Sequence, residues 1–241
     1  MIRFVEIPLG LGSACACVRC AAQTEREFFS AEVIRVAVGD VIDAWSGGPG
    51  PNVLFTGPEP FSHPELPGIV ASAAAAGIER IGLRTDAGAL SVPGNSEGVL
   101  AAGVRHLQVV CLAGTAEAHD ALASRPGLFD AAESGLASFL AAAQASHAHV
   151  AVTGIVPACS HNLPELPTAV AALTRTGALA VEIAASPGIA DTPGFADWVS
   201  AAIDTGLVNG VWVSVTGIEP SKTPRSQLHA VTPFSLSVDA S

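Results

Sequence analysis

Positive charge is scarce in this sequence. Lys222 is the only lysine of the chain, and the formal net charge at pH 7 is −11. Proteins that bind a phosphate backbone need clustered lysine and arginine, so neither a nucleic acid nor an anionic membrane surface is an expected partner. Long hydrophobic runs are missing as well. No stretch reaches about 18 uninterrupted apolar residues, which argues against a membrane-spanning helix.

Cysteines are few and odd in number. Of the five, Cys15, Cys17 and Cys20 lie within the stretch GLGSACACVRC. An odd, clustered set does not form the paired framework of a disulfide-rich secreted protein. The N-terminal run carries Glu6 and is typical of a β-strand rather than of a signal peptide. We therefore expect a cytoplasmic protein in which the cysteine cluster has a metal or redox role.

Short β-rich runs alternate with alanine- and leucine-rich helical stretches along the chain. Strands are predicted at residues 2–7, 52–56, 80–84, 106–111, 149–155, 178–184 and 210–215, and helices at residues 30–45, 63–76, 96–102, 129–145, 163–176 and 193–205. Asn162 is the predicted N-cap of the fifth helix. This alternation predicts an α/β fold in which helices cover a parallel sheet.

The number of strand–helix units suits a partial or complete (β/α) TIM-type barrel, and an open doubly wound sheet is the alternative. No linker-like segment divides the chain. We therefore expect one domain over residues 1–220, followed by a fraying C-terminal tail at residues 221–241.

Three conspicuous motifs follow the first three predicted strands. They are the cysteine stretch, TGPEP at residues 56–60, and RTDAG at residues 84–88. In parallel α/β folds the loops after the carboxyl ends of the strands carry the chemistry. The three motifs are therefore expected to share one functional face.

The order of these motifs resembles the radical S-adenosylmethionine (radical SAM) family. The strongest stretch is residues 52–90, in which TGPEPFSHPEL is similar to the family's Gly-Gly-Glu-Pro turn and following helix start. RTDAG stands where the third strand of the family typically ends in Thr-Asn-Gly. Two further blocks, GVRHLQVVCLAGTAEAHDALASRPGLFDAAESGL and HNLPELPTAVAAL, extend the resemblance over residues 2–190. It implies a radical SAM-like barrel enzyme of unknown catalytic residues.

The resemblance implies a [4Fe–4S] cluster held by cysteine thiolates, the soft ligands that such clusters require. The family pattern Cys-x-x-x-Cys-x-x-Cys aligns Cys17 and Cys20 with the second and third ligands, and places Ser13 at the first. Cys15 lies only two residues away, within roughly 7 Å along the chain. We predict Cys15, Cys17 and Cys20 as the metal ligands.

S-adenosyl-L-methionine is the implied second cofactor. Its reductive cleavage would give a 5′-deoxyadenosyl radical acting on a small-molecule or peptide substrate, with a flavodoxin or ferredoxin as electron donor. Pro58 replaces the second glycine of the turn but keeps the carbonyl oxygen that the ammonium group would need. The residues expected to bind this cofactor are Gly57, Pro58, Glu59, Pro60, Arg19 and Asp86.

Other interpretations stay open at this point. Ser13 in place of a cysteine also suits a catalytically degenerate radical SAM-like protein that binds a small molecule or a partner without a cluster. A third possibility is an unrelated TIM-barrel lyase or hydrolase that uses Glu59 and Asp86. The remaining cysteines, Cys111 and Cys159, are expected to be buried and inert.

Overall fold

A computed structural model describes residues 4–12, 27–48 and 50–217 of the protein. Seven parallel strands form one sheet: β1 (Val5–Pro8), β4 (Asn52–Thr56), β5 (Arg80–Thr85), β6 (Val104–Val110), β7 (Ala151–Ala158), β8 (Ala180–Ala185) and β9 (Trp212–Thr216). The spatial order of these strands is their order along the chain. A doubly wound sheet reverses its order at a switch point, so this alternative is wrong.

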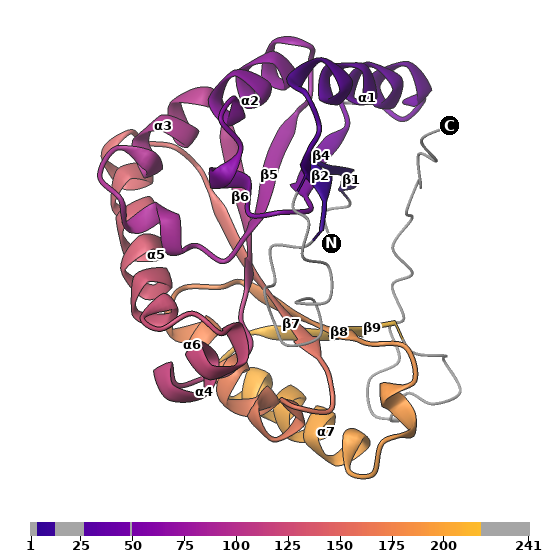
Figure 1. Ribbon diagram of the computed structural model, residues 1–241, viewed down its shortest axis with the longest axis vertical. Coiled ribbons are helices and arrows are strands. Elements are labelled where there is room, and N and C mark those ends of the chain that lie inside the picture. The colour runs from indigo at the N-terminus through magenta and orange to yellow at the C-terminus, as the bar shows by residue number, and fades with distance from the viewer. Residues whose placement is uncertain (1–3, 13–26, 49, 218–241) are drawn as a thin grey trace.

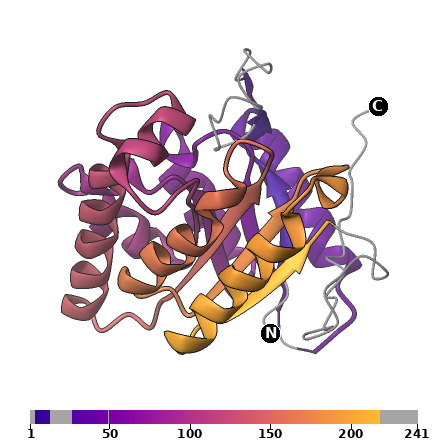
Figure 2. The same ribbon diagram turned by 90° about the horizontal axis from the view of Figure 1, so that it is seen from below.

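The sheet curls into a partial barrel with its helices outside (Figure 1). The helices are α1 (Ala31–Ala44), α2 (Leu66–Ala75), α3 (Asn95–Ala102), α4 (Ala116–Ala123), α5 (Leu128–Ala145), α6 (Leu166–Arg175) and α7 (Phe195–Val208). Seen from below, they cover the outer face of the strands (Figure 2). The predicted α/β partial-barrel fold is thereby confirmed.

The core lies between the sheet and the helices. Because side chains of a strand alternate between its two faces, one residue in two points outward to the helices. On β4 and β5 these are Val53, Phe55, Ile81 and Leu83, all almost fully buried in the main hydrophobic cluster. The residues between them face the concave side of the sheet.

Two predictions about local structure need correction. The helix α4 was not among the predicted helices, and its N-cap is Thr115, whose hydroxyl accepts from the Ala118 N–H. Asn162 makes no side-chain cap. Its amide instead donates to the carbonyls of Leu112 and Pro157, which ties the loops after β6 and β7 together. The predicted tail at residues 221–241 lies outside the described residues.

Within the described ranges, none of the helices combines the length and the apolar character that crossing a membrane requires.

Candidate functional site

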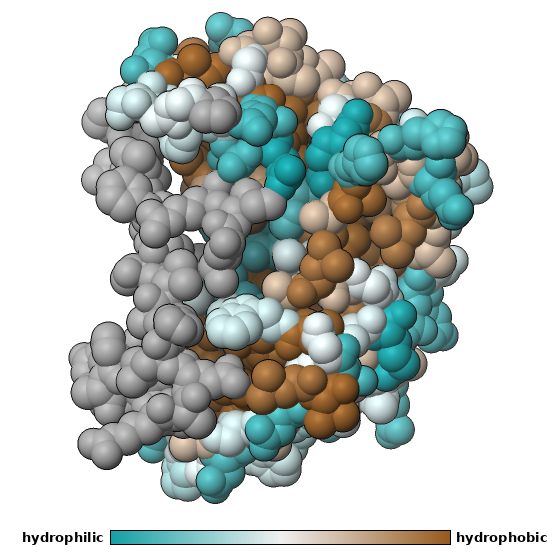
Figure 3. Space-filling view, turned by 180° about the vertical axis from the view of Figure 1, so that it is seen from behind, coloured by the Kyte–Doolittle hydropathy of each residue, from teal (hydrophilic) through white to brown (hydrophobic). Residues whose placement is uncertain are grey.

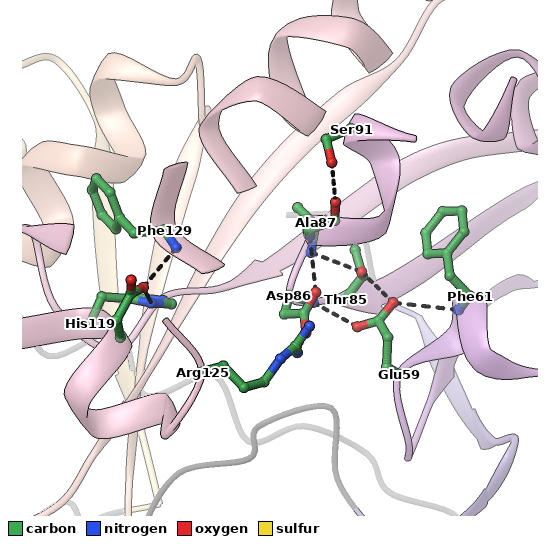
Figure 4. Close-up of polar contacts among 11 residues, drawn as sticks. Glu59, Phe61, Thr85, Asp86, Ala87, Ser91, His119, Arg125 and Phe129 are labelled. Atoms are coloured by element: carbon green, nitrogen blue, oxygen red, sulfur yellow. Dashed lines mark hydrogen bonds and ion pairs between the residues drawn. The ribbon is translucent and has the colours of Figure 1, made fainter. Parts of the chain in front are cut away.

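Glu59 joins the loops that follow β4 and β5 (Figure 4). Its Oε1 accepts a hydrogen bond from the Thr85 hydroxyl at 2.7 Å and a longer one from the Phe61 N–H at 3.4 Å. Its Oε2 accepts from the Asp86 N–H at 2.9 Å. The carboxylate therefore connects two of the three motifs that the sequence places on one face.

The Glu59 carboxyl is almost completely buried, with 6% of the residue exposed. Burial, and secondarily the charge of Asp86, raise its pKa from 4.5 to about 7, against the three hydrogen bonds that favour the ionised form. An acid with a pKa near neutrality can be held protonated or ionised by small changes in its surroundings.

Asp86 organises the turn after β5. Its Oδ1 accepts from the Gly88 N–H at 2.9 Å, and its Oδ2 forms an ion pair with Arg125. Ala87, which lies between Asp86 and Gly88 in the sequence, adopts the left-handed conformation, with φ of 63°. Glycine occupies that region without strain, whereas alanine is disfavoured there by about 1–2 kcal/mol. The turn therefore keeps a glycine-type backbone although the residue is alanine.

A pocket of about 310 Å³ opens beside these carboxylates. Its charged lining residues are Glu59, Asp86 and Arg125, and the rest of the lining comes from short loops and the start of α5. Arg125 is 45% exposed at its side chain, so its guanidinium faces both the buried Asp86 carboxylate and the pocket. The pocket combines charged groups of both signs at the carboxyl edge of the sheet.

The two described ends of the cysteine-bearing segment lie side by side next to Gly57. The strands β2 (Gly10–Leu11) and β3 (Glu27–Phe28), which flank residues 13–26, pair in antiparallel register. A Cβ atom on Gly10 would lie 2.1 Å from the backbone carbonyl oxygen of Glu27. A Cβ atom on Gly57, where φ is 99°, would lie 3.0 Å from the backbone carbonyl oxygen of Gly10. Only glycine permits this approach of the turn to the base of the segment.

His63 fixes the same base from the other side. Its Nδ1 accepts from the Glu65 N–H at 3.1 Å, so the proton is on Nε2, which donates to the Phe29 carbonyl at 3.0 Å. Its ring also meets Phe28 edge-on, with centroids 5.1 Å apart. This histidine is therefore a positioning residue, which the sequence presented only as a helix start.

The turn that follows β4 has two backbone carbonyls without a hydrogen-bond donor among the described residues. The carbonyl oxygens of Gly57 and Pro58 accept no hydrogen bond from the residues that the structure describes. The carbonyls of Glu59 and Pro60, by contrast, accept from the N–H groups of Ser62 and His63. Two unused carbonyls at a strand end suit a ligand ammonium group, so the turn fits the amino group of S-adenosylmethionine.

The other predicted site residues are distributed as follows. Cys15, Cys17, Arg19 and Cys20 lie outside the described residues, as does Ser13. Among the residues that are described, no group of three or more His, Cys, Asp and Glu side chains is placed to hold a metal ion.

Cys111 and Cys159 are the two cysteines that the structure describes. Cys111 is buried, as expected, and burial raises the pKa of its thiol to about 12, so it stays protonated. The Cys111 thiol therefore offers no reactive thiolate near neutral pH. Cys159, which was also expected to be buried, is only half-buried, so this part of the prediction is wrong. Cys159 serves below as a control position.

Arg125 is the site residue that sequence reasoning missed. It lies 39 positions from Asp86 along the chain, in the turn between α4 and α5. Asp120 shapes that turn by accepting from the N–H groups of Gly127 and Phe129. The stretch SRPG gives a turn signal, but nothing in it indicates which carboxylate the arginine meets.

Comparison with known proteins identifies the fold. No family model and no curated protein matches the sequence. Solved structures of radical SAM enzymes do match it. SuiB from Streptococcus suis, bound to S-adenosylmethionine, is 12% identical, with 91% of this chain and 48% of SuiB covered and a TM-score of 0.60.

Two further structures give the same result. The enzyme anSMEcpe, with bound AdoMet and Cp18Cys peptide, is 12% identical over 89% of this chain and 63% of its own, with a TM-score of 0.62. Methylornithine synthase (PylB) is 10% identical, with 99% of this chain and 78% of its own chain covered and a TM-score of 0.54. At these identities the likeness shows a radical SAM-like fold. The chain spans about half the length of SuiB.

Proposed function

We propose that the protein is a radical SAM-type iron–sulfur enzyme. It binds a [4Fe–4S] cluster through Cys15, Cys17 and Cys20, and S-adenosylmethionine at the turn that follows β4. The observation that carries this proposal is the contact of Gly57 with Gly10, because it sets the turn against the base of the segment that bears the three cysteines. The radical SAM-like fold supports the same assignment.

Each part of the turn has its own task. The carbonyls of Gly57 and Pro58 accept the hydrogen bonds of the methionine ammonium group. Glu59, whose oxygens are already engaged by Thr85 and Asp86, holds the loops after β4 and β5 in register. A cluster held by these cysteines would supply the electron for the reductive cleavage of S-adenosylmethionine to methionine and a 5′-deoxyadenosyl radical. The chain keeps the cofactor oriented and shields this radical from water.

The partners follow from the same proposal. Reduction of the cluster requires a one-electron donor such as a flavodoxin or ferredoxin. The substrate is a small molecule or a peptide. A peptide is favoured by two of the structurally similar enzymes, since SuiB was captured with the precursor peptide SuiA and anSMEcpe with the Cp18Cys peptide.

A second candidate function is supported by Ser13. A serine hydroxyl stays protonated near neutral pH and is a poor iron ligand, so the chain suits a degenerate protein that binds S-adenosylmethionine or another small molecule without a cluster. The two proposals differ in whether Cys15 replaces the missing ligand.

The test is turnover of S-adenosylmethionine by the anaerobically reconstituted, dithionite-reduced protein. We expect 5′-deoxyadenosine from the natural sequence and from Cys159→Ala, and none from Cys17→Ala or Cys20→Ala. Loss of the product in Cys15→Ala, but not in Ser13→Ala, identifies the third ligand. Binding of S-adenosylmethionine without iron or product would support the degenerate protein. An activity that survives air and chelator would indicate the lyase or hydrolase instead.

A further inference from the structure

A row of polar side chains crosses the concave face of the sheet. Arg84 on β5 donates from Nη1 to Glu6 on β1 at 3.1 Å, and from Nε to the Gln108 Oε1 on β6 at 2.5 Å. Gln108 in turn donates to the Glu182 Oε2 on β8 at 3.4 Å, and the Thr216 hydroxyl on β9 donates to its Oε1 at 2.7 Å.

These contacts show that the row lies inside the curl. Glu6 and Arg84 reach each other across β4, and Gln108 and Glu182 reach each other across β7, although neither pair is on neighbouring strands. Side chains can meet over an intervening strand only on the concave side, where curvature brings them together. In the space-filling view a hollow opens on this side, with hydrophilic residues at its floor (Figure 3).

The row is also close to the proposed cofactor turn. Arg84 immediately precedes Thr85, whose hydroxyl contacts Glu59, but its side chain points to the opposite face of β5. A molecule resting on the row would therefore lie next to the carboxyl edge of β4 and β5.

The two carboxylates of the row differ in how their charge is balanced. Glu6 is paired with the Arg84 guanidinium. Glu182 is half-buried and forms no ion pair with an arginine, lysine or histidine of the described residues. Its described partners, the Thr216 hydroxyl and the Gln108 amide, are neutral. Carboxylates removed from water are usually paired with a cation, and the described part of the chain supplies none to Glu182.

We propose that Glu182 binds a cationic group of the substrate, an alkylammonium or guanidinium of the kind that lysine and arginine side chains carry. The remaining N–H groups of Arg84 and Gln108, on the same face of the sheet, donate hydrogen bonds to the carbonyl or carboxylate oxygens of the same molecule. This inference rests on the proposed function, since it names the substrate chemistry of that barrel. The formal net charge of −11 further favours a cationic ligand.

The test measures binding to the full-length protein without iron, in the absence and in the presence of S-adenosylmethionine. The probes are N-acetyl-Gly-Lys-Gly-amide, the same peptide with Nε-acetyllysine, and n-butylamine, with dissociation constants from titration calorimetry. The lysine peptide is expected to bind at least about tenfold more tightly than the acetylated peptide, because a hydrogen bond to a charged group is lost. Binding of n-butylamine as well would indicate that a free amine suffices, and its failure to bind would indicate a peptide ligand.

The variants isolate the carboxylate. Glu182→Gln keeps the acceptor for Thr216 and removes the charge, so it is expected to lower affinity for the lysine peptide about tenfold or more. Glu182→Asp keeps the charge on a side chain one methylene shorter. Its affinity for the lysine peptide should lie between those of the natural sequence and of Glu182→Gln. Glu97→Gln, the same change on the exposed outer helix α3, is the matched control and should bind as the natural sequence does.

Three results would overturn the inference. They are equal affinity for the two peptides, unchanged affinity in Glu182→Gln, and no binding of either the lysine peptide or n-butylamine at millimolar concentration with or without S-adenosylmethionine. The peptide comparison uses only the natural sequence, so it stands even if a variant fails to fold. Because binding is measured without iron, failure here leaves the product assay of the proposed function unaffected, and the reverse also holds.

Discussion

The protonation of Glu59 should make the stability of the protein depend on pH in a way that one variant removes. The folded protein raises the pKa of this carboxyl to about 7, from 4.5. Between these two values the folded state holds a proton that the unfolded chain has released. The free energy of unfolding should therefore fall as pH rises through this window, and level off above about pH 7.

The size of the effect follows from the pKa difference. One pKa unit corresponds to about 1.4 kcal/mol, so the Glu59 contribution between pH 4.5 and pH 8 is on the order of 3 kcal/mol. Glu59→Gln cannot titrate. Its amide oxygen can accept from the Asp86 N–H, and its amide group can donate to the Thr85 hydroxyl, so the two shorter contacts at this position have replacements and only the 3.4 Å contact from the Phe61 N–H is lost.

Urea unfolding of both proteins at several pH values between 4.5 and 8 measures this difference directly. We expect the natural sequence to lose stability relative to Glu59→Gln as pH rises, by on the order of 3 kcal/mol over the range. Glu65→Gln, an exposed site six residues away, should follow the natural sequence. Parallel stability curves for the natural sequence and Glu59→Gln would refute the reasoning.

Two other predictions concern the packing around the pocket. Gly135→Ala places a Cβ 2.3 Å from the Ala87 oxygen, so it should destabilise the protein by about 1–3 kcal/mol, whereas Gly98→Ala on α3 meets nothing within 4 Å and should stabilise it by about 0.5–1 kcal/mol. Arg125→Ala leaves the buried Asp86 carboxylate unpaired and should lower the free energy of unfolding by about 1–3 kcal/mol. Arg35→Ala removes an exposed ion pair with Glu32 and should lower it by less than about 1 kcal/mol. Chemical denaturation checks all four, and equal effects within either pair would contradict the structure.

The sheet and most helices could be predicted from the sequence because their signals are local. Apolar runs such as residues 52–56 recur between helical stretches, and the order of strands in space follows their order along the chain. The helix α4 was missed because its buried face is small, with only His119 and Ala123 buried, and one of these two is a polar residue. Such a face gives no apolar periodicity to recognise.

The site was predictable only in part. The position of Glu59 at a strand end marked it as functional, but its contact with Thr85 depends on how two loops meet. The Arg125 ion pair and the Gln108–Glu182 hydrogen bond join residues far apart in the chain, and the second depends on how strongly the sheet curls. Such contacts leave no mark in the spacing of residues, so the sequence could not indicate them.

We propose that the segment bearing Cys15, Cys17 and Cys20, whose flanking residue Gly10 lies next to Gly57, binds an iron–sulfur cluster. The most direct test is the iron and sulfide content, with the visible absorption spectrum, of anaerobically reconstituted protein and of Cys17→Ala, with Cys159→Ala as control. We expect a brown protein with one [4Fe–4S] cluster per chain, kept in Cys159→Ala and lost in Cys17→Ala. A colourless natural protein without iron, or undiminished iron in Cys17→Ala, would contradict it.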